Sequence, residues 1–343
     1  MIAVLLLAAI GLGAWLALRS QPKREAHLLV GVDDDTLKWT ADPLGVVRWQ
    51  QALGARAVRV WVPWQGEARP TGMRLDELAR AEQAAQHTHV VLAVFGFARS
   101  TPTTERTQVR FCRYAGAALA RVPHARAIVV WNEANSPAYW SGTAAQYASL
   151  LARCYDVLHR RGVTVLDSTA SAHAPGRFLR ELGAAYRASG RTQPLVDAFG
   201  HNPYPRTAAE LPQTVHTDGF LGQGDYAHLM RVLHASFGRA PDVWYLETGF
   251  QSSVPARLLR HYDGRENVVT ITPEQQAQRL GEAIRLAACQ EHVRAFFNFE
   301  LVDETRLSGW QSGLIWRGAQ RKPAAAAFAQ AARQAAAGCS GRP

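Results

Sequence analysis

The 343-residue sequence lacks the motifs that define several large classes of protein. It has no glycine-rich phosphate loop, no zinc-finger spacing and no basic run interleaved with aromatic residues, so we expect neither nucleotide nor nucleic-acid binding. Its four cysteines form no CxxC pair and have no histidine at ligand spacing, so we expect no metal site and no cofactor. Charged residues make up only 19% of the chain and hydrophobic ones 48%, which excludes a mostly disordered protein.

The balance of charge is basic. The chain has 38 Lys and Arg against 28 Asp and Glu, a formal net charge of +10 at pH 7. Such a balance suits an anionic partner, either lipid headgroups or an acidic polymer such as an acidic glycan.

The amino-terminal residues 1–18 form an uncharged apolar run that is followed directly by basic residues. A signal peptide usually carries its positive charge before the apolar stretch, and the positive-inside rule here favours a cytoplasmic body. The cysteines favour export instead, so we expect a body that is secreted or membrane-anchored and faces an extracytoplasmic space. The predicted parts are a signal or anchor segment (1–18, with residues 2–18 as the tether), a basic linker (19–26), a catalytic barrel (27–338) and a tail (339–343).

Eight short apolar segments alternate with helical patterns along the chain. Their near-continuous hydrophobic character is typical of strands that are buried on both faces. Eightfold alternation over roughly 300 residues predicts an α/β fold, a closed (β/α)8 TIM barrel, and we expect it to be a monomer. A doubly wound sheet is the alternative, but the turn after the first strand is acidic and not glycine-rich. The predicted strands are His27–Val32, Ala57–Val62, His89–Phe95, Ala127–Trp131, Val163–Asp167, Val196–Phe199, Val243–Glu247 and Val293–Phe299.

The cysteines fall on neighbouring helices of this predicted barrel. Cys112 and Cys154 lie on the third and fourth helices, and Cys289 and Cys339 lie on the seventh and eighth. We therefore predict the disulfides Cys112–Cys154 and Cys289–Cys339. Free buried thiols that act as small hydrophobic side chains are the alternative.

Two glutamates end predicted strands. Glu133 follows the fourth strand and Glu247 ends the seventh. In a barrel of this kind the reacting groups lie at the carboxyl ends of the strands, so both side chains are expected at the same mouth. A pair of carboxyl groups there can divide the roles of acid and nucleophile, as cleavage of a glycosidic bond requires.

On these residues the sequence resembles the clan A retaining glycoside hydrolases, the group that includes families 5 and 39. The resemblance rests on the dipeptide Asn132-Glu133 at the fourth strand and on Glu247 at the seventh. It implies that Glu133 is the general acid/base, Glu247 the nucleophile and Asn132 a donor to the sugar 2-hydroxyl. Arg59, in the second strand, matches the arginine that supports the nucleophile, and an arginine within an apolar strand needs a carboxylate partner. The retaining mechanism predicts carboxyl groups ~5–5.5 Å apart.

The end of the sixth strand and the segment after the eighth extend the resemblance. His201-Asn202-Pro203-Tyr204 is similar to a His-Pro-Tyr motif of the clan, with the histidine displaced by one position. The resemblance places the Tyr204 hydroxyl on the nucleophile and His201 near the acid/base. The run from Gly309 to Leu314 is similar to one in actinobacterial-type cellulase-like hydrolases.

Aromatic side chains at the barrel mouth are expected to stack on sugar rings. Trp64 and Trp310 are the first candidates, although core packing explains a buried tryptophan equally well. Further tryptophans near strand ends are Trp39, Trp61 and Trp140.

The combined hypothesis is a retaining glycosidase that cleaves β-glycosidic bonds of a polysaccharide, acting inside the chain because tryptophans spread along the mouth suit an open cleft. A catalytically silent carbohydrate-binding or scaffold barrel tethered to the membrane is the first alternative. A metal-dependent barrel hydrolase is the second, and its ligand set is missing from the strand ends. The sequence leaves open which sugar is bound and what Asp33, Asp34, Asp35 and Asp303 do.

Overall fold

The computed structural model describes residues 28–339. The predicted anchor and linker and most of the tail lie outside these residues. No helix in the described part of the chain is both long enough and apolar enough to cross a membrane.

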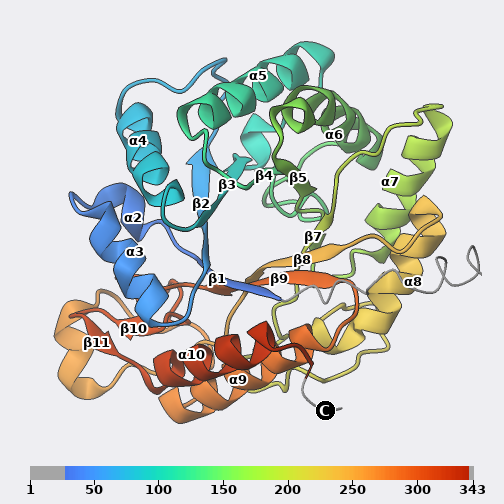
Figure 1. Cartoon of the computed structure of the whole chain (residues 1–343). Coiled ribbons are helices and arrows are strands. Elements are labelled where there is room, and N and C mark those ends of the chain that lie inside the picture. The colour runs from blue at the N-terminus through green and yellow to red at the C-terminus, as the bar shows by residue number, and fades with distance from the viewer. Residues whose placement is uncertain (1–27, 340–343) are drawn as a thin grey trace, which may run out of the picture.

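Parallel strands form the wall of a barrel, seen end-on in Figure 1. The sheet has the order β5-β4-β3-β2-β1-β9-β8-β7-β6. Its edges meet through a parallel bridge between Leu166 and Ala198, which closes the ring. The predicted (β/α)8 barrel is confirmed. The strands are β1 (Leu29–Asp33), β2 (Ala57–Pro63), β3 (His89–Phe95), β4 (Ala127–Val130), β5 (Thr164–Asp167), β6 (Ala170–Ser171), β7 (Phe199–Asn202), β8 (Val243–Thr248) and β9 (Val293–Phe299).

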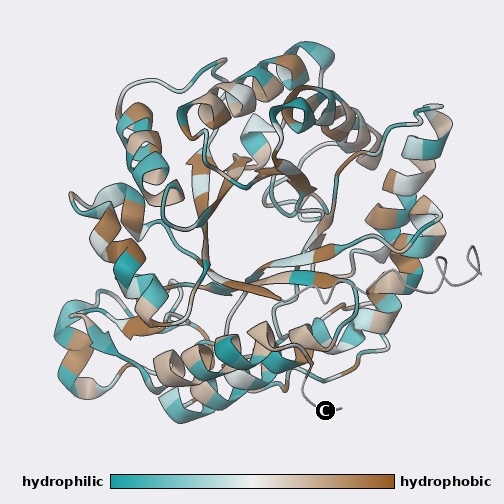
Figure 2. Ribbon diagram, viewed as in Figure 1, coloured by the Kyte–Doolittle hydropathy of each residue, from teal (hydrophilic) through white to brown (hydrophobic). Residues whose placement is uncertain are grey.

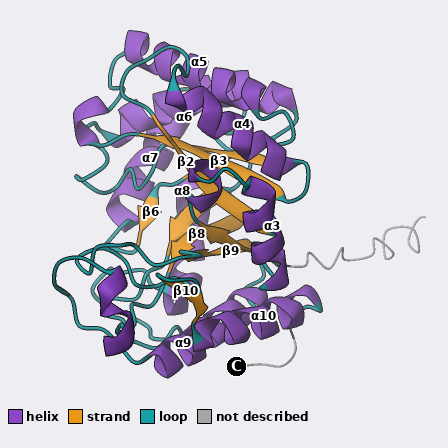
Figure 3. Ribbon diagram, turned by 90° about the vertical axis from the view of Figure 1, so that its left-hand side faces the viewer, coloured by secondary structure: helices purple, strands orange, loops and turns teal. Residues whose placement is uncertain are grey.

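Helices surround this wall, and the long loops gather on one side of it (Figure 3). Helices α9 and α10 begin at Pro273 and Pro323, where a proline suits the first turn because it has no amide to leave unpaired. A two-stranded hairpin, β10 (Ile315–Trp316) and β11 (Gln320–Arg321), lies in the last loop. The helices are α2 (Thr36–Trp39), α3 (Pro43–Ala52), α4 (Met73–Ala85), α5 (Glu105–Arg121), α6 (Ala144–Leu158), α7 (Gly176–Ala188), α8 (Tyr226–Phe237), α9 (Pro273–Ala288) and α10 (Pro323–Ala336).

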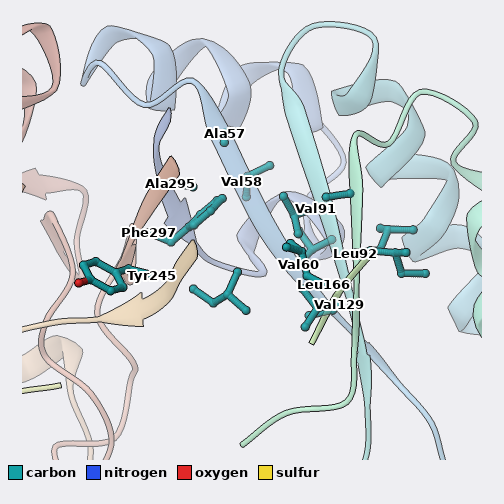
Figure 4. Close-up of a cluster of buried hydrophobic side chains, with 14 of the residues drawn as sticks. Ala57, Val58, Val60, Val91, Leu92, Val129, Leu166, Tyr245, Ala295 and Phe297 are labelled. Atoms are coloured by element: carbon teal, nitrogen blue, oxygen red, sulfur yellow. The ribbon is translucent and has the colours of Figure 1, made fainter. Parts of the chain in front are cut away.

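Branched and aromatic side chains pack against both faces of the barrel wall. Val58, Val60, Leu92 and Phe297 are among the buried residues drawn in Figure 4, and all four are fully inaccessible to solvent. The strands are largely hydrophobic, whereas the helices combine hydrophobic and hydrophilic segments (Figure 2). The sequence pattern of doubly buried strands therefore corresponds to a packed interior with the polar groups left at the ends.

The sixth predicted strand is displaced along the chain. The apolar residues Val196–Phe199 predicted it, but β7 covers Phe199–Asn202. Its second half is polar and still fully buried, with His201 and Asn202 at 1% and 0% exposure. Hydrophobicity marks only the first half because the second half faces the loops of the barrel mouth.

Both predicted disulfides are confirmed. Cys112 on α5 is bonded to Cys154 on α6, and Cys289 after α9 is bonded to Cys339 after α10. Each bond joins helices that are neighbours in the barrel, so each closes a loop of 42 or 50 residues.

Replacing Cys112 and Cys154 together by alanine is expected to lower the free energy of unfolding by about 2–4 kcal/mol, because the unfolded chain regains the entropy of an open loop. Urea unfolding of the non-reduced proteins measures the difference. The same experiment after reduction is the control, since reduced wild type and the reduced variant should then unfold at similar urea concentrations. An unchanged midpoint without reductant would contradict the stabilising role.

Candidate active site

A cavity of about 710 Å³ opens at the carboxyl ends of the strands. Residues from β1, β2, β3, β8 and β9 and from the loops after β4, β5, β7 and β9 form its wall. The predicted site residues on this wall are Arg59, Asn132, Glu133, Tyr204, Glu247 and Trp310.

The backbone after β4 is turned sharply where Glu133 begins. Trp131 and Glu133 have positive φ values of 73° and 38°, which non-glycine residues adopt only at a cost of roughly 1–3 kcal/mol each. The Trp131 ring is buried and its Nε1 donates to the carbonyl of Tyr139 at 3.0 Å. The packed indole therefore stabilises the turn that brings Asn132 and Glu133 to the cavity.

The Glu133 carboxyl group retains its proton up to near neutral pH. Burial raises its pKa to about 7, and the negative charge of Glu247 acts in the same direction. Asn202 opposes this shift by donating from Nδ2 to Oε1 at 3.0 Å, and the positive charge of Arg59 opposes it from a greater distance. The environment thus prepares Glu133 to donate a proton near neutral pH.

Glu247 has the opposite surroundings. Its Oε1 lies 2.8 Å from Nη1 of Arg59, and its Oε2 accepts a bond from the Tyr204 hydroxyl at 3.5 Å. The Arg59 guanidinium is buried, and its pKa is raised by the neighbouring carboxylates Asp33 and Glu247 against the cost of burial. A permanent cation beside Glu247 stabilises its negative charge. The two glutamates on the cavity wall therefore differ in their partners: Glu247 is ion-paired with a buried arginine, whereas Glu133 accepts a hydrogen bond from an amide.

Asn132 is held by its amide oxygen. Arg59 donates to Oδ1 from Nη2 at 3.0 Å, and Ser168 donates to it at 3.1 Å. Because both bonds use the oxygen, the orientation of the side chain is fixed. Among the described residues Nδ2 has no partner, so it remains available to donate to a bound molecule.

His201 does not reach the cavity. Its ring is buried below the wall, where Nδ1 bonds to the carbonyl of Ala170 at 2.8 Å and burial lowers its pKa to about 4. Asn202, the next residue, bonds to Glu133 in its place. The prediction of His201 as a site residue is therefore corrected to Asn202. The sequence indicated this replacement, because Asn202 directly precedes Pro203, the position at which the clan motif has its histidine.

Trp64 is also corrected. It is 2% exposed and does not line the cavity. Its ring packs edge-on against Phe111 and Trp131, and its Nε1 donates to the carbonyl of Glu67 at 2.8 Å. The structure therefore makes Trp64 part of the core.

Trp310 does line the cavity. Its ring centroid is 4.9 Å from that of Tyr204 and 5.5 Å from that of Phe299. Tyr139 and Phe97 form a second aromatic surface on the wall, with stacked rings whose centroids are 5.8 Å apart, and neither was predicted from the sequence. Both lie in loops without a motif, so only the assembled fold brings them to the site.

The three acids after β1 have local partners. Asp33 is ion-paired with Arg59, and Asp34 accepts hydrogen bonds from three backbone amides. Asp35 lies 2.9 Å from Lys38. These residues build the cavity wall, and residues 28–339 contain no cluster of three or more His, Cys, Asp or Glu side chains arranged to hold a metal ion.

Asp303 is buried away from the cavity. Its carboxylate lies 2.7 Å from Nζ of Lys322 and accepts from the Tyr262 hydroxyl at 2.9 Å. Both charges are fully buried, so removal of either one would leave the other uncompensated. We assign this pair to the stability of the last loop.

The Asn202→Ala variant is expected to move the alkaline limb of the pH–activity profile to higher pH. The Asn202 amide favours the ionised form of Glu133, so its loss raises the pKa of Glu133 further above its ordinary value. The measurement is kcat/KM against pH. Asn135→Ala is the matched control, because the Asn135 side chain bonds to Ser171 and to the backbone of His173 instead. A limb that stays in place in both variants would contradict the assignment.

No protein-family model and no curated protein matches the sequence. Among solved structures, the chain is similar to a family 39 glycoside hydrolase from Bacteroides cellulosilyticus WH2, with a TM-score of 0.63 and 17% identity. That match covers 90% of this chain and 64% of the other, so this chain spans less than two thirds of that protein.

Two further structures extend the comparison. A GH5_18 protein from Streptomyces cattleya in complex with GlcNAc has a TM-score of 0.63 and 18% identity, over 90% of this chain and 80% of that one. A GH128 endo-β-1,3-glucanase from Amycolatopsis mediterranei has a TM-score of 0.52 and 14% identity, over 90% and 99%. The chain thus has the barrel fold seen in family 39 and family 5 glycoside hydrolases, in agreement with the resemblance noted in its sequence.

Proposed function

We propose that the protein is a retaining glycoside hydrolase that cleaves β-glycosidic bonds within a polysaccharide. One observation carries the proposal: a carboxyl group with a pKa of about 7, Glu133, shares a cavity with a carboxylate that is ion-paired to a buried arginine, Glu247. Such a pair supplies a proton donor and an anionic nucleophile at the same pH.

In the first step the Glu247 carboxylate attacks the anomeric carbon while Glu133 transfers its proton to the departing glycosidic oxygen. Arg59 and Tyr204 hold the Glu247 carboxylate from two sides. Asn132, fixed through its oxygen, donates from Nδ2 to the sugar 2-hydroxyl. The bond to the leaving group breaks as the ester to Glu247 forms.

In the second step water hydrolyses the glycosyl ester. Esterification removes the negative charge of Glu247, which is one of the two causes of the raised pKa of Glu133. The pKa of Glu133 therefore falls when the intermediate forms, and its carboxylate accepts a proton from the attacking water. Two displacements at one carbon return the original anomeric configuration.

The walls of the cavity support a polysaccharide substrate. Trp310, Tyr139 and Phe97 offer ring faces for sugar stacking, and Trp39 extends the aromatic surface to the rim, where it is 67% exposed. An exposed aromatic rim suits a chain that continues beyond the cavity, which supports internal cleavage. Solved structures of this fold include one named as an endo-β-1,3-glucanase.

The disulfides support an extracytoplasmic location, because such bonds persist in oxidising compartments. We therefore propose that the catalytic body is secreted or anchored outside the cytoplasm.

A screen of soluble β-glycans tests the proposal, with reducing ends as the readout and proton NMR of the first product formed. The expected result is turnover of at least one glycan with the anomeric configuration of the product unchanged. A product of opposite configuration would exclude the double displacement. Glycan binding without turnover, equally tight in wild type and Glu247→Ala, would favour a silent carbohydrate-binding barrel.

A further inference from the structure

The end of the barrel opposite the cavity is strongly basic. In this fold the helix-to-strand loops lie at the amino ends of the strands, away from the mouth. These loops and the last helical turns before them carry exposed arginines for which the structure shows no carboxylate within 4 Å in the described part of the chain. They are Arg56, Arg121, Arg126, Arg160, Arg161, Arg187, Arg239 and Arg333.

Carboxylates at this end do not balance those arginines, because they are fewer and most of them are already paired. Asp156 is bonded to Arg191 at 2.7 Å, and Asp242 lies 2.8 Å from Arg294. The pKa of His89 responds to the surplus: partial desolvation lowers it, and the positive charges of Arg126 and Arg56 lower it further. The potential at this end is therefore positive.

The surface is also hollowed. A second cavity, of about 420 Å³, lies between α3, α10 and the start of β3. Arg56, Arg333, His87 and His89 are on its wall with hydrogen-bonding groups of Gln51 and Thr88. A basic hollow of this kind can accept a phosphate group.

The opposite end has a different charge pattern. The wall of the main cavity carries both signs of charge, with Asp33, Asp34, Glu300 and Glu304 accompanied by Arg59, Arg206, Arg306 and Arg317. The surplus of positive charge therefore lies at the amino end of the barrel, which faces away from the main cavity.

The first described residue, Leu28, lies at this basic end, because it directly precedes β1. The preceding residues contain the apolar run 1–18 and the basic Arg19, Lys23 and Arg24. The intervening residues 19–27 span at most roughly 30 Å when extended, so an apolar segment held in a bilayer would keep this end of the barrel close to the lipid surface.

We propose that the amino-terminal end of the barrel is a docking surface for a bilayer of anionic phospholipids, with their phosphate groups bound by the unpaired arginines. Docked in this way, the protein holds the mouth of its main cavity away from the membrane, toward polymers in the surrounding space. The attraction is a sum over many arginines, so it depends on the charge of the lipid and on salt.

Binding of the full-length protein to vesicles tests the proposal. The vesicles are made of phosphatidylcholine alone or mixed with phosphatidylglycerol, and binding is measured by co-sedimentation at low and at high salt. The test variant R126Q/R160Q/R333Q removes three charges from the basic end. The matched control R69Q/R99Q/R265Q removes three from the loops at the mouth, where no carboxylate of the described residues lies within 4 Å of those arginines.

We expect the test variant to lose roughly a hundredfold in partition onto phosphatidylglycerol vesicles at low salt, and the control to lose far less. Any contribution of the apolar segment to vesicle binding is the same in the wild type and in both variants, and it persists on vesicles of phosphatidylcholine alone. Equal losses in both variants, or binding that ignores phosphatidylglycerol, would overturn the proposal. So would equally tight binding to a soluble sulfated polysaccharide, which would assign the surface to an acidic polymer.

Thermal unfolding of each variant separates lost binding from lost structure. The replaced arginines are exposed, so unchanged midpoints are expected. If the triple variant melts early, the single variant R126Q decides the question, with an expected loss of about fivefold on anionic vesicles and none on neutral ones.

Discussion

The Glu247→Gly variant is expected to lose activity by roughly 10⁴-fold or more, because the first displacement has no nucleophile without its carboxylate. Substrate binding should change little, since in the proposed mechanism the aromatic rings and Asn132 bind the sugar. The measurement is kcat and KM on the glycan found in the screen and on an aryl glycoside with a good leaving group.

Azide gives this variant a sharper test. The glycine leaves a hollow beside Arg59, and an azide ion in that hollow can attack the anomeric carbon from the face that Glu247 used. We expect azide to restore cleavage of the aryl glycoside and to give a glycosyl azide of inverted configuration. Rescue with retained configuration would move the nucleophile to another residue.

Glu304→Gln is the matched control for the loss of a carboxylate. Glu304 also lies on the cavity wall but not beside Arg59. The activity of the Glu304→Gln variant should therefore stay within a few-fold of that of the wild type. If Glu304→Gln lost as much activity as Glu247→Gly, the loss would follow from removing any negative charge in the cavity and would not identify Glu247 as the nucleophile.

The Glu133→Gln variant is expected to lose roughly 10²–10⁴-fold in kcat/KM on glycans, because no acid protonates the departing oxygen. The loss should be much smaller on aryl glycosides whose leaving groups need no proton. This dependence on the leaving group distinguishes an acid from a residue that only binds substrate.

The pH profile gives the second readout for Glu133. In wild type the active form is protonated, so kcat/KM should fall as the pH rises through about 7. Glutamine does not titrate, and the alkaline limb should therefore disappear in the variant. Persistence of the same limb would assign it to another group. Azide rescue should here give a product of retained configuration, the opposite of the result with glycine at position 247.

The strands were predictable because strands buried on both faces are continuously apolar, and this local signal does not depend on the rest of the fold. The same signal failed at β7, whose polar half, His201 and Asn202, is buried by the fold and not by its own hydrophobicity. The disulfides followed from the order of the helices alone.

The part of the site that lies at the ends of strands could be predicted, because the carboxyl ends of all barrel strands meet at one mouth. Glu133 and Glu247 share a cavity because both lie at the carboxyl ends of barrel strands. The neighbours of these glutamates could not be predicted from the sequence in the same way, because Asn202 is 69 residues away from Glu133. Likewise, Trp64 belongs to the core because of the aromatic rings that pack around it. Sequence spacing does not encode which side of a loop a ring occupies.

The closure of the barrel has a consequence for its motions. Every other seam is a ladder of backbone bonds, whereas β5 and β7 meet through a single bridge at Leu166 and Ala198, beyond which the short β6 takes over. Local opening of the barrel is expected first between β5 and β7, because the fewest backbone hydrogen bonds must break there. Ser168 and Asn202, which steady Asn132 and Glu133, lie just past that joint. Opening the ring would thus loosen Glu133, the proposed proton donor, because Asn202 holds it from across the joint, whereas Glu247 would keep its ion pair with Arg59 on β2.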